Sequence, residues 1–190
     1  MVTGWPSRLG QRGVSMIEVL VTIFILVIAL MALGRLQARL QVSEMESYQR
    51  AQALILVKDM ASRMLANRRN AASYVTSSPL GGSSDCPTSG TARRDADWAE
   101  WCDLLKGAGE RDASSARVGA MLGGRGCIVS TGLADEYRIT VAWQGLIPVS
   151  LPANSPACGS GSYNGTGTSA CINDLCRRIV STLVRFGSGA

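Results

Sequence analysis

Hydrophobic and polar positions divide the chain into a long apolar N-terminal segment and a mixed remainder. Residues 14–33 are apolar apart from Ser15, Glu18, Thr22 and a few small side chains. A helix of these 20 residues is roughly 30 Å long, which matches the hydrocarbon core of a bilayer. The pattern therefore predicts a membrane-spanning helix.

The helical pattern continues beyond this segment. Residues 34–70 contain no proline and are rich in Ala, Leu, Met, Gln, Glu and Arg, which favour helices. Apolar residues recur there at helical spacing, so we expect one helix over residues 14–66, roughly 80 Å long, whose second half packs on a sheet. The apolar face comprises Val42, Met45, Ala53, Leu56, Val57, Met60 and Met64, and the opposite face comprises Arg39, Glu46, Arg50, Lys58 and Arg63.

Shorter elements are predicted in the remainder of the chain. Residues 74–91 are rich in Ser, Gly, Pro and Thr, which predicts a loop. A short helix follows, with Asp95 or Asp97 as its N-cap and Gly107 at its end. Its apolar residues lie at i, i+3, i+4 and i+7, and they are Trp98, Trp101, Cys102 and Leu105. We expect the two tryptophans to be core residues.

Three strands are predicted after the short helix. Residues 127–129 are a short apolar run, and residues 137–144 alternate between apolar and polar side chains. Residues 178–186 are apolar on both faces, which predicts a position inside the sheet. Residues 145–170 form a long loop, and such loops in compact domains are usually functional or crosslinked.

The composition excludes several classes of protein. The chain has 190 residues, of which 46% are hydrophobic and 5% aromatic, which excludes disordered, collagen-like and multi-pass membrane proteins. Histidine is absent, so the usual general base and the commonest metal ligand are missing. We therefore expect no enzyme activity, no cofactor and no metal site. The formal charge of +5 is spread along the chain and does not by itself indicate nucleic-acid binding.

Six cysteines lie in the last 105 residues, and their even number indicates disulfides in an oxidising compartment. They are Cys86, Cys102, Cys127, Cys158, Cys171 and Cys176. Fifteen pairings are possible. We prefer the set Cys86–Cys102, Cys127–Cys176 and Cys158–Cys171. The first pair would close a loop around the short helix, the second would join two strands, and the third would tie the long loop.

The segment before the apolar block, residues 1–13, contains Arg8 and Arg12 and no acid. This pattern also fits a secretory signal peptide, with a cleavage site near Gly34, or a simple signal anchor. Against both, Gly13 directly precedes the apolar block and the helical pattern continues past its end. Glu18 is also unexpected there, because an isolated intramembrane acid costs roughly 2.5–3.5 kcal/mol.

The stretch from Gly13 to Leu20 resembles the class III signal peptide of type IV prepilins. The resemblance implies cleavage between Gly13 and Val14 and N-methylation of Val14. It also identifies Glu18 with the acid at the fifth mature position. The family usually has Phe where this chain has Val14. A counter-charge for Glu18 could come from the terminal amine of a neighbouring subunit, which would set the axial register of a fibre.

The likeness extends to minor pilins of the PilV family, through residues 17–21, 50–53, 59–64, 66–68 and 137–145. It implies an α+β type IV pilin fold, in which a long N-terminal helix packs on an antiparallel sheet. Four parts follow: a leader (1–13), a transmembrane and assembly half-helix (14–34), an amphipathic half-helix (35–70) and a periplasmic head (71–190). Major pilins usually carry a helix-kinking Pro where this chain has Arg35, which also favours a minor component.

The resemblance implies a minor pilin that joins other minor pilins in a priming complex at the bacterial inner membrane. It would initiate pilus assembly and lie at or near the tip, supporting adhesion and twitching motility. Its expected partners are minor pilins, the major pilin, prepilin peptidase, the inner-membrane assembly platform, a tip adhesin and, before assembly, the lipid bilayer. Two alternatives remain: a pseudopilin of a type II secretion system, and a DNA-binding minor pilin for DNA uptake.

Two further motifs are weak. Residues 159–161 (Gly-Ser-Gly) lack the Lys-Ser/Thr of a phosphate loop, which favours a turn-rich loop. Residues 68–69 and 93–94 are Arg-Arg pairs that could contact DNA phosphates. Because four acidic residues lie close to the second pair, we interpret these arginines as a solvated face and do not expect nucleic-acid binding. The acids are Asp95, Asp97, Glu100 and Asp103.

Overall fold

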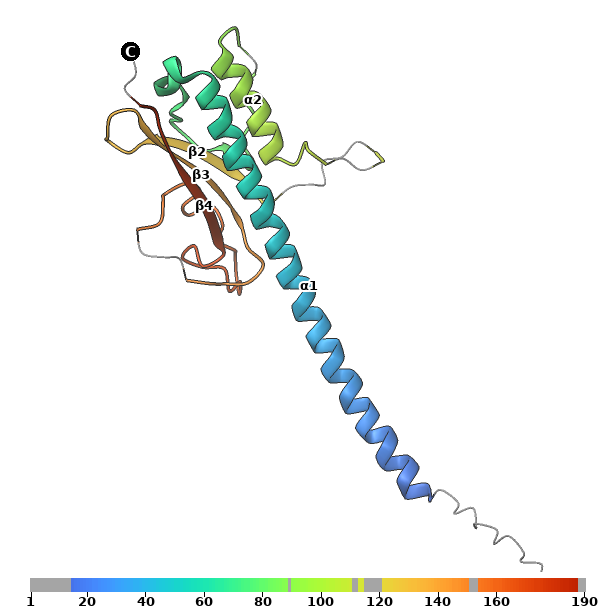
Figure 1. Cartoon of the computed structure of the whole chain (residues 1–190). Helices are drawn as coiled ribbons and strands as arrows, with labels where there is room; N and C mark the ends of the chain where they lie inside the picture. The colour runs from blue at the N-terminus through green and yellow to red at the C-terminus, as the bar shows by residue number, and fades with distance from the viewer. Residues whose placement is uncertain (1–14, 89, 111–112, 115–120, 151–153, 188–190) are drawn as a thin grey trace, which may run out of the picture. The chain divides into compact units, whose positions relative to one another are not determined.

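The computed structural model describes residues 15–88, 90–110, 113–114, 121–150 and 154–187 (Figure 1). Gly13 and Val14, at the expected cleavage site, lie outside the described residues. The chain divides into two compact units, residues 1–43 and 44–190. In chain order the elements are α1 (Met16–Ala66), the 3-10 helix η1 (Arg68–Tyr74), β1 (Leu80–Gly81), α2 (Arg93–Leu105), β2 (Arg125–Ser130), β3 (Glu136–Gln144) and β4 (Arg177–Arg185).

The second unit contains a four-stranded antiparallel sheet in the order β1-β2-β3-β4. One face of the sheet packs against the second half of α1 and against α2. The expected α+β type IV pilin fold is confirmed, with a long N-terminal helix, an antiparallel sheet and three disulfides.

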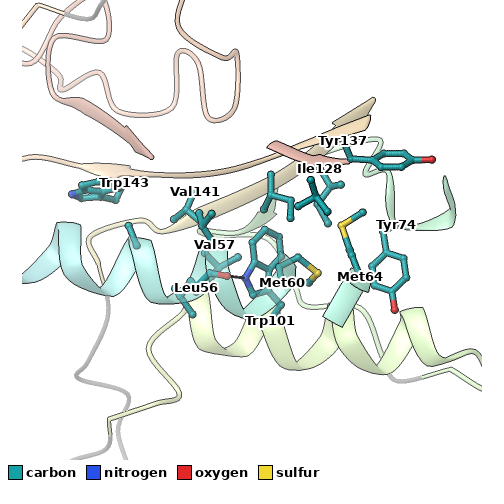
Figure 2. Close-up of a cluster of buried hydrophobic side chains, with 14 of the residues drawn as sticks. Leu56, Val57, Met60, Met64, Tyr74, Trp101, Ile128, Tyr137, Val141 and Trp143 are labelled. Carbon is teal, nitrogen blue, oxygen red and sulfur yellow. Dashed lines mark hydrogen bonds between the residues drawn. The ribbon is translucent and has the colours of Figure 1, made fainter. Parts of the chain in front are cut away.

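The predicted apolar stripe of α1 packs into the core between the helices and the sheet, together with residues of η1, α2, β2, β3 and β4 (Figure 2). Five of the seven predicted positions are buried: Ala53, Leu56, Val57, Met60 and Met64. Met45 is instead exposed, and the polar residue Gln49 is buried in its place. Trp101 is fully buried, and its indole N–H donates a hydrogen bond of 2.9 Å to the carbonyl of Leu56.

The opposite face of the sheet is partly covered by the long loop between β3 and β4. Cys158 and Tyr163 of this loop pack on Ala142 of β3, together with the partly buried Cys127 and Ile179. This second layer explains why β4 is apolar on both faces. The prediction that β4 lies inside the sheet was wrong, because it is the last strand of the order β1-β2-β3-β4 and gains its second apolar contact from the loop.

The three disulfides are Cys86–Cys102, Cys127–Cys158 and Cys171–Cys176. The first agrees with the expected pairing, and the expected pairs Cys127–Cys176 and Cys158–Cys171 are corrected. Cys127 lies on β2 and Cys176 directly precedes β4, so β3 separates them. Two strand spacings of about 4.8 Å exceed the separation that a disulfide can bridge. Cys127 faces the loop layer, where it meets Cys158.

Candidate functional site: the N-terminal segment of helix α1

The start of α1 is fixed by a local hydrogen-bond motif. Ser15 directly precedes the helix, and the backbone N–H of Glu18 donates to its hydroxyl (3.3 Å) and to its carbonyl (3.0 Å). The N–H of Val19 also donates to the Ser15 carbonyl, at 3.3 Å. Ser and Glu three residues apart form the sequence signature of a capping box. This role of Ser15 was not predicted, although the Ser-x-x-Glu spacing is visible in the sequence.

Glu18 therefore lies in the first turn of α1. A carboxylate at this position is stabilised by the positive end of the helix dipole. Its side chain is exposed, and among the residues that the structure describes none forms an ion pair with it. The carboxylate is thus held at a defined point of the helix and is open to a partner from another molecule.

The polar side chains of the segment share one helical face. Ser15, Glu18 and Thr22 are three and four residues apart, so they lie within about 60° of one another around the helix. The hydroxyl of Thr22 donates to the carbonyl of Val19 at 2.9 Å, which satisfies it within the helix. Glu18 is the charged group on this face, and within the described residues its carboxylate has no ion-pair partner.

Large apolar side chains occupy the remaining faces of this segment. These side chains are exposed along the whole segment; for example, Met16 is 86% exposed, Phe24 is 66% exposed and Met31 is 64% exposed. The most apolar 18-residue window of α1 has a mean hydropathy of 2.9, and by length and composition the helix can cross a membrane. So much exposed apolar surface indicates a segment that is covered by lipid or by other helices.

The Gly-rich turn and the Arg93-Arg94 pair form contacts within the head. The carboxylate of Asp174 accepts the N–H of Gly161 (2.9 Å) and the hydroxyl of Ser160 (3.0 Å), so the chain's own acid occupies the Gly-rich turn. Arg93 pairs with Asp97 at 3.2 Å, and Arg94 pairs with its neighbour Asp95 and lies over the ring of Trp98. The arginines at 68–69 are exposed.

Neither Asp95 nor Asp97 is the N-cap that we expected. The N-cap of α2 is Ala92, and the side chain of Asp97 is buried. It accepts hydrogen bonds from the hydroxyl of Tyr74 (2.6 Å) and from Arg63 (3.2 Å), which joins α1, η1 and α2. Burial, and then the hydrogen bond to Asp97, raises the pKa of Tyr74 above its usual value. This cluster stabilises the head, and its pairing could not be read from local spacing.

Comparison with known proteins bears on the N-terminal segment alone. Residues 8–34 match the model of the prokaryotic N-terminal methylation motif. The matched range includes Gly13, Val14 and Glu18 and most of the exposed apolar segment. No curated protein and no solved structure matches the chain. The motif is a prepilin-type signal, and with the fold it supports a type IV pilin-like protein that is anchored in a membrane through α1.

Proposed function

We propose that the chain is a minor type IV pilin that is held in the inner membrane by α1, with its head in the periplasm, before it enters a fibre. One observation carries this proposal: the methylation motif over residues 8–34 coincides with an exposed apolar helix that presents Glu18 in its first turn. A structural subunit needs this combination, because the apolar surface can exchange lipid for neighbouring helices during assembly.

Glu18 has a specific task in this proposal. In an apolar surrounding an unpaired carboxylate is costly, and a terminal amine at Val14 of a neighbouring subunit would neutralise it. Only one axial position of the incoming subunit satisfies that pair, so the pair sets the register of assembly. The capping hydrogen bonds of Ser15 keep Glu18 at the start of the helix, where an amine can reach it.

A minor role is supported by the continuity of α1. The helix runs through Arg35 as one element, at the position where major pilins usually have a kinking proline. We propose that the subunit joins other minor pilins in a priming complex, lies at or near the tip and supports a tip adhesin, adhesion and twitching motility. A type II secretion pseudopilin fits the same motif, so gene deletion must separate the two. Lost pili with intact secretion supports the pilin, and the reverse supports the pseudopilin.

The proposal is tested with Glu18→Gln, which removes the charge and keeps the shape. Glu44→Gln is the matched control, because Glu44 is also an exposed acid on α1 but lies outside the matched motif. Mass analysis of wild type and both variants should find a terminus at Val14. Glu18→Gln should then be absent from purified pili, while Glu44→Gln is incorporated normally. A mature terminus after Gly34, or normal incorporation of Glu18→Gln, contradicts the proposal.

A further inference from the structure

Strand β4 leaves one edge of the sheet open (Figure 1). On its other side β4 pairs with β3, and backbone hydrogen bonds close both ends of this pair. The N–H of Gly145 donates to the carbonyl of Cys176 (2.7 Å), and the N–H of Phe186 donates to the carbonyl of Asp135 (2.9 Å). The backbone groups of an antiparallel strand alternate in direction along the strand. The N–H and C=O groups of even-numbered residues of β4 therefore bond β3, and those of odd-numbered residues point away from β3. Those with outward N–H and C=O groups are Ile179, Ser181, Leu183 and Arg185. Within the described residues, no hydrogen bond reaches these backbone groups.

This edge lacks the usual protection against pairing with another chain. Natural edge strands are kept short or are interrupted by proline, bulges or charges. Strand β4 has nine residues in unbroken register with β3, without proline or glycine. Residues 179–184 (Ile-Val-Ser-Thr-Leu-Val) are uncharged, and four of these six are β-branched, which favours extended pairing.

The three arginines of β4 differ in how far their guanidinium groups are bound by other residues of the head. Arg177 is buried and donates to the carbonyls of Pro156 and Cys158, and Arg178 donates to the carbonyl of Ile147. Arg185 is bound on one side to Glu136 but its side chain remains 65% exposed. Glu136 accepts hydrogen bonds from Nε and Nη2 of Arg185, so Nη1 is the donor of this guanidinium that remains open, within the described residues, at the far end of the edge. No acid lies on β4 itself.

Two exposed apolar side chains, separated by Arg138 of β3, lie near the same end of the edge. The loop layer covers the sheet around Cys127 and Ala142. Farther along the same face, Leu183 is 55% exposed and Val129 is 40% exposed. A strand that is added beside β4 would therefore gain a side-chain contact with Leu183 as well as backbone hydrogen bonds.

We propose that the edge of β4 binds an extended segment of another protein, which adds a fifth strand to the sheet. The segment carries an apolar side chain beside Leu183 and an acidic side chain beside Arg185. Backbone pairing gives affinity and the alternate side chains give specificity, as in other cases of strand addition. A second copy of this chain fits less well, because β4 carries no acidic residue that could bond the open Nη1 of Arg185 on its partner. This inference does not depend on the proposed pilin function.

Amide hydrogen exchange of the full chain in detergent micelles tests the proposal. The probe is an eight-residue peptide of alternating valine and threonine with a glutamate at each end, and its control has lysine at each end. The glutamate peptide should slow exchange of the amides of Ser181, Leu183 and Arg185 at least tenfold. The lysine peptide should bind at least tenfold more weakly.

Two variants separate edge pairing from loss of structure. Ser181→Pro removes an outward N–H that β3 does not use, and Ser181→Ala keeps this N–H while losing the same hydroxyl. Protection should vanish in Ser181→Pro and persist in Ser181→Ala, with thermal midpoints of the two variants close together. Absence of protection at millimolar peptide, or equal binding of both peptides, overturns the proposal. Protection that rises with chain concentration without peptide identifies a second copy as the occupant and also overturns it.

Discussion

Replacing Asp97 with asparagine tests whether the buried carboxylate holds the helices of the head together. Asp97 is 1% exposed, and it bonds the hydroxyl of Tyr74 at 2.6 Å, Arg63 at 3.2 Å and Arg93 at 3.2 Å. The asparagine keeps the shape of the side chain but removes its charge. It also replaces one acceptor with an N–H₂ group, which must face either a guanidinium or a hydroxyl.

The expected size of the effect follows from the three partners. A hydrogen bond to a charged group contributes about 1.5–3 kcal/mol, and breaking a buried ion pair costs about 3–5 kcal/mol. Arg93 adds little, because its side chain is 70% exposed. Arg63 keeps its contacts with Asp59 (2.9 Å) and Glu100 (2.5 Å), which offsets part of the loss. We therefore expect Asp97→Asn to lower the free energy of unfolding by about 2–4 kcal/mol.

The measurement is unfolding of the full chain in micelles, followed by tryptophan fluorescence with the disulfides intact. Asp95→Asn is the matched control, because Asp95 lies in the first turn of the same helix and pairs with Arg94 nearer the surface. It should cost less than about 1 kcal/mol. A double-mutant cycle with Tyr74→Phe should show coupling between Tyr74 and Asp97. An Asp97→Asn protein within about 0.5 kcal/mol of wild type would refute the reasoning.

Two further predictions concern the same core. In Gly126→Ala, the new Cβ would collide with the ring of Trp101, which is fully buried and cannot move without losing its hydrogen bond to the carbonyl of Leu56. We expect the free energy of unfolding, measured by denaturant titration, to fall by about 1–3 kcal/mol. Gly187→Ala is the neutral control, because a Cβ at Gly187 meets no neighbour. The raised pKa of Tyr74 stabilises the fold fully below the unfolded-state pKa of about 10, and this contribution is lost as the pH rises through the folded-state pKa. The stability difference between wild type and Tyr74→Phe should therefore shrink above pH 10, and a constant difference would contradict the assignment.

The helical part of the molecule was predictable because its signals are local. The stripe from Ala53 to Met64 repeats at helical spacing, and the structure buries these positions. Gly107, with φ of 87°, follows the end of α2 as expected. Met45 and Gln49 deviate, because the sheet's reach along α1 decides burial there and no local pattern encodes it.

The errors share a different cause, which is the order of the strands. Apolar residues on both faces of β4 suggested a central strand, but the second face is covered by a loop rather than by a helix layer. The same unknown order led to the pairing of Cys127 with Cys176, which β3 keeps apart. Strand order depends on contacts between residues far apart in sequence, so spacing alone could not supply it.

Glu18 and Asp97 lie in different parts of the chain, so the test of assembly with Glu18→Gln and the test of head stability with Asp97→Asn are independent. The buried residues of α1 begin at Gln49, whereas Glu18 lies in an exposed segment whose contacts are local to the helix. Effects at independent sites without shared partners normally add. Glu18→Gln should therefore leave unfolding of the head unchanged, so that its loss from pili reports assembly and not misfolding. Conversely, an Asp97→Asn subunit that still folds should keep its terminus at Val14, because processing depends on the N-terminal motif.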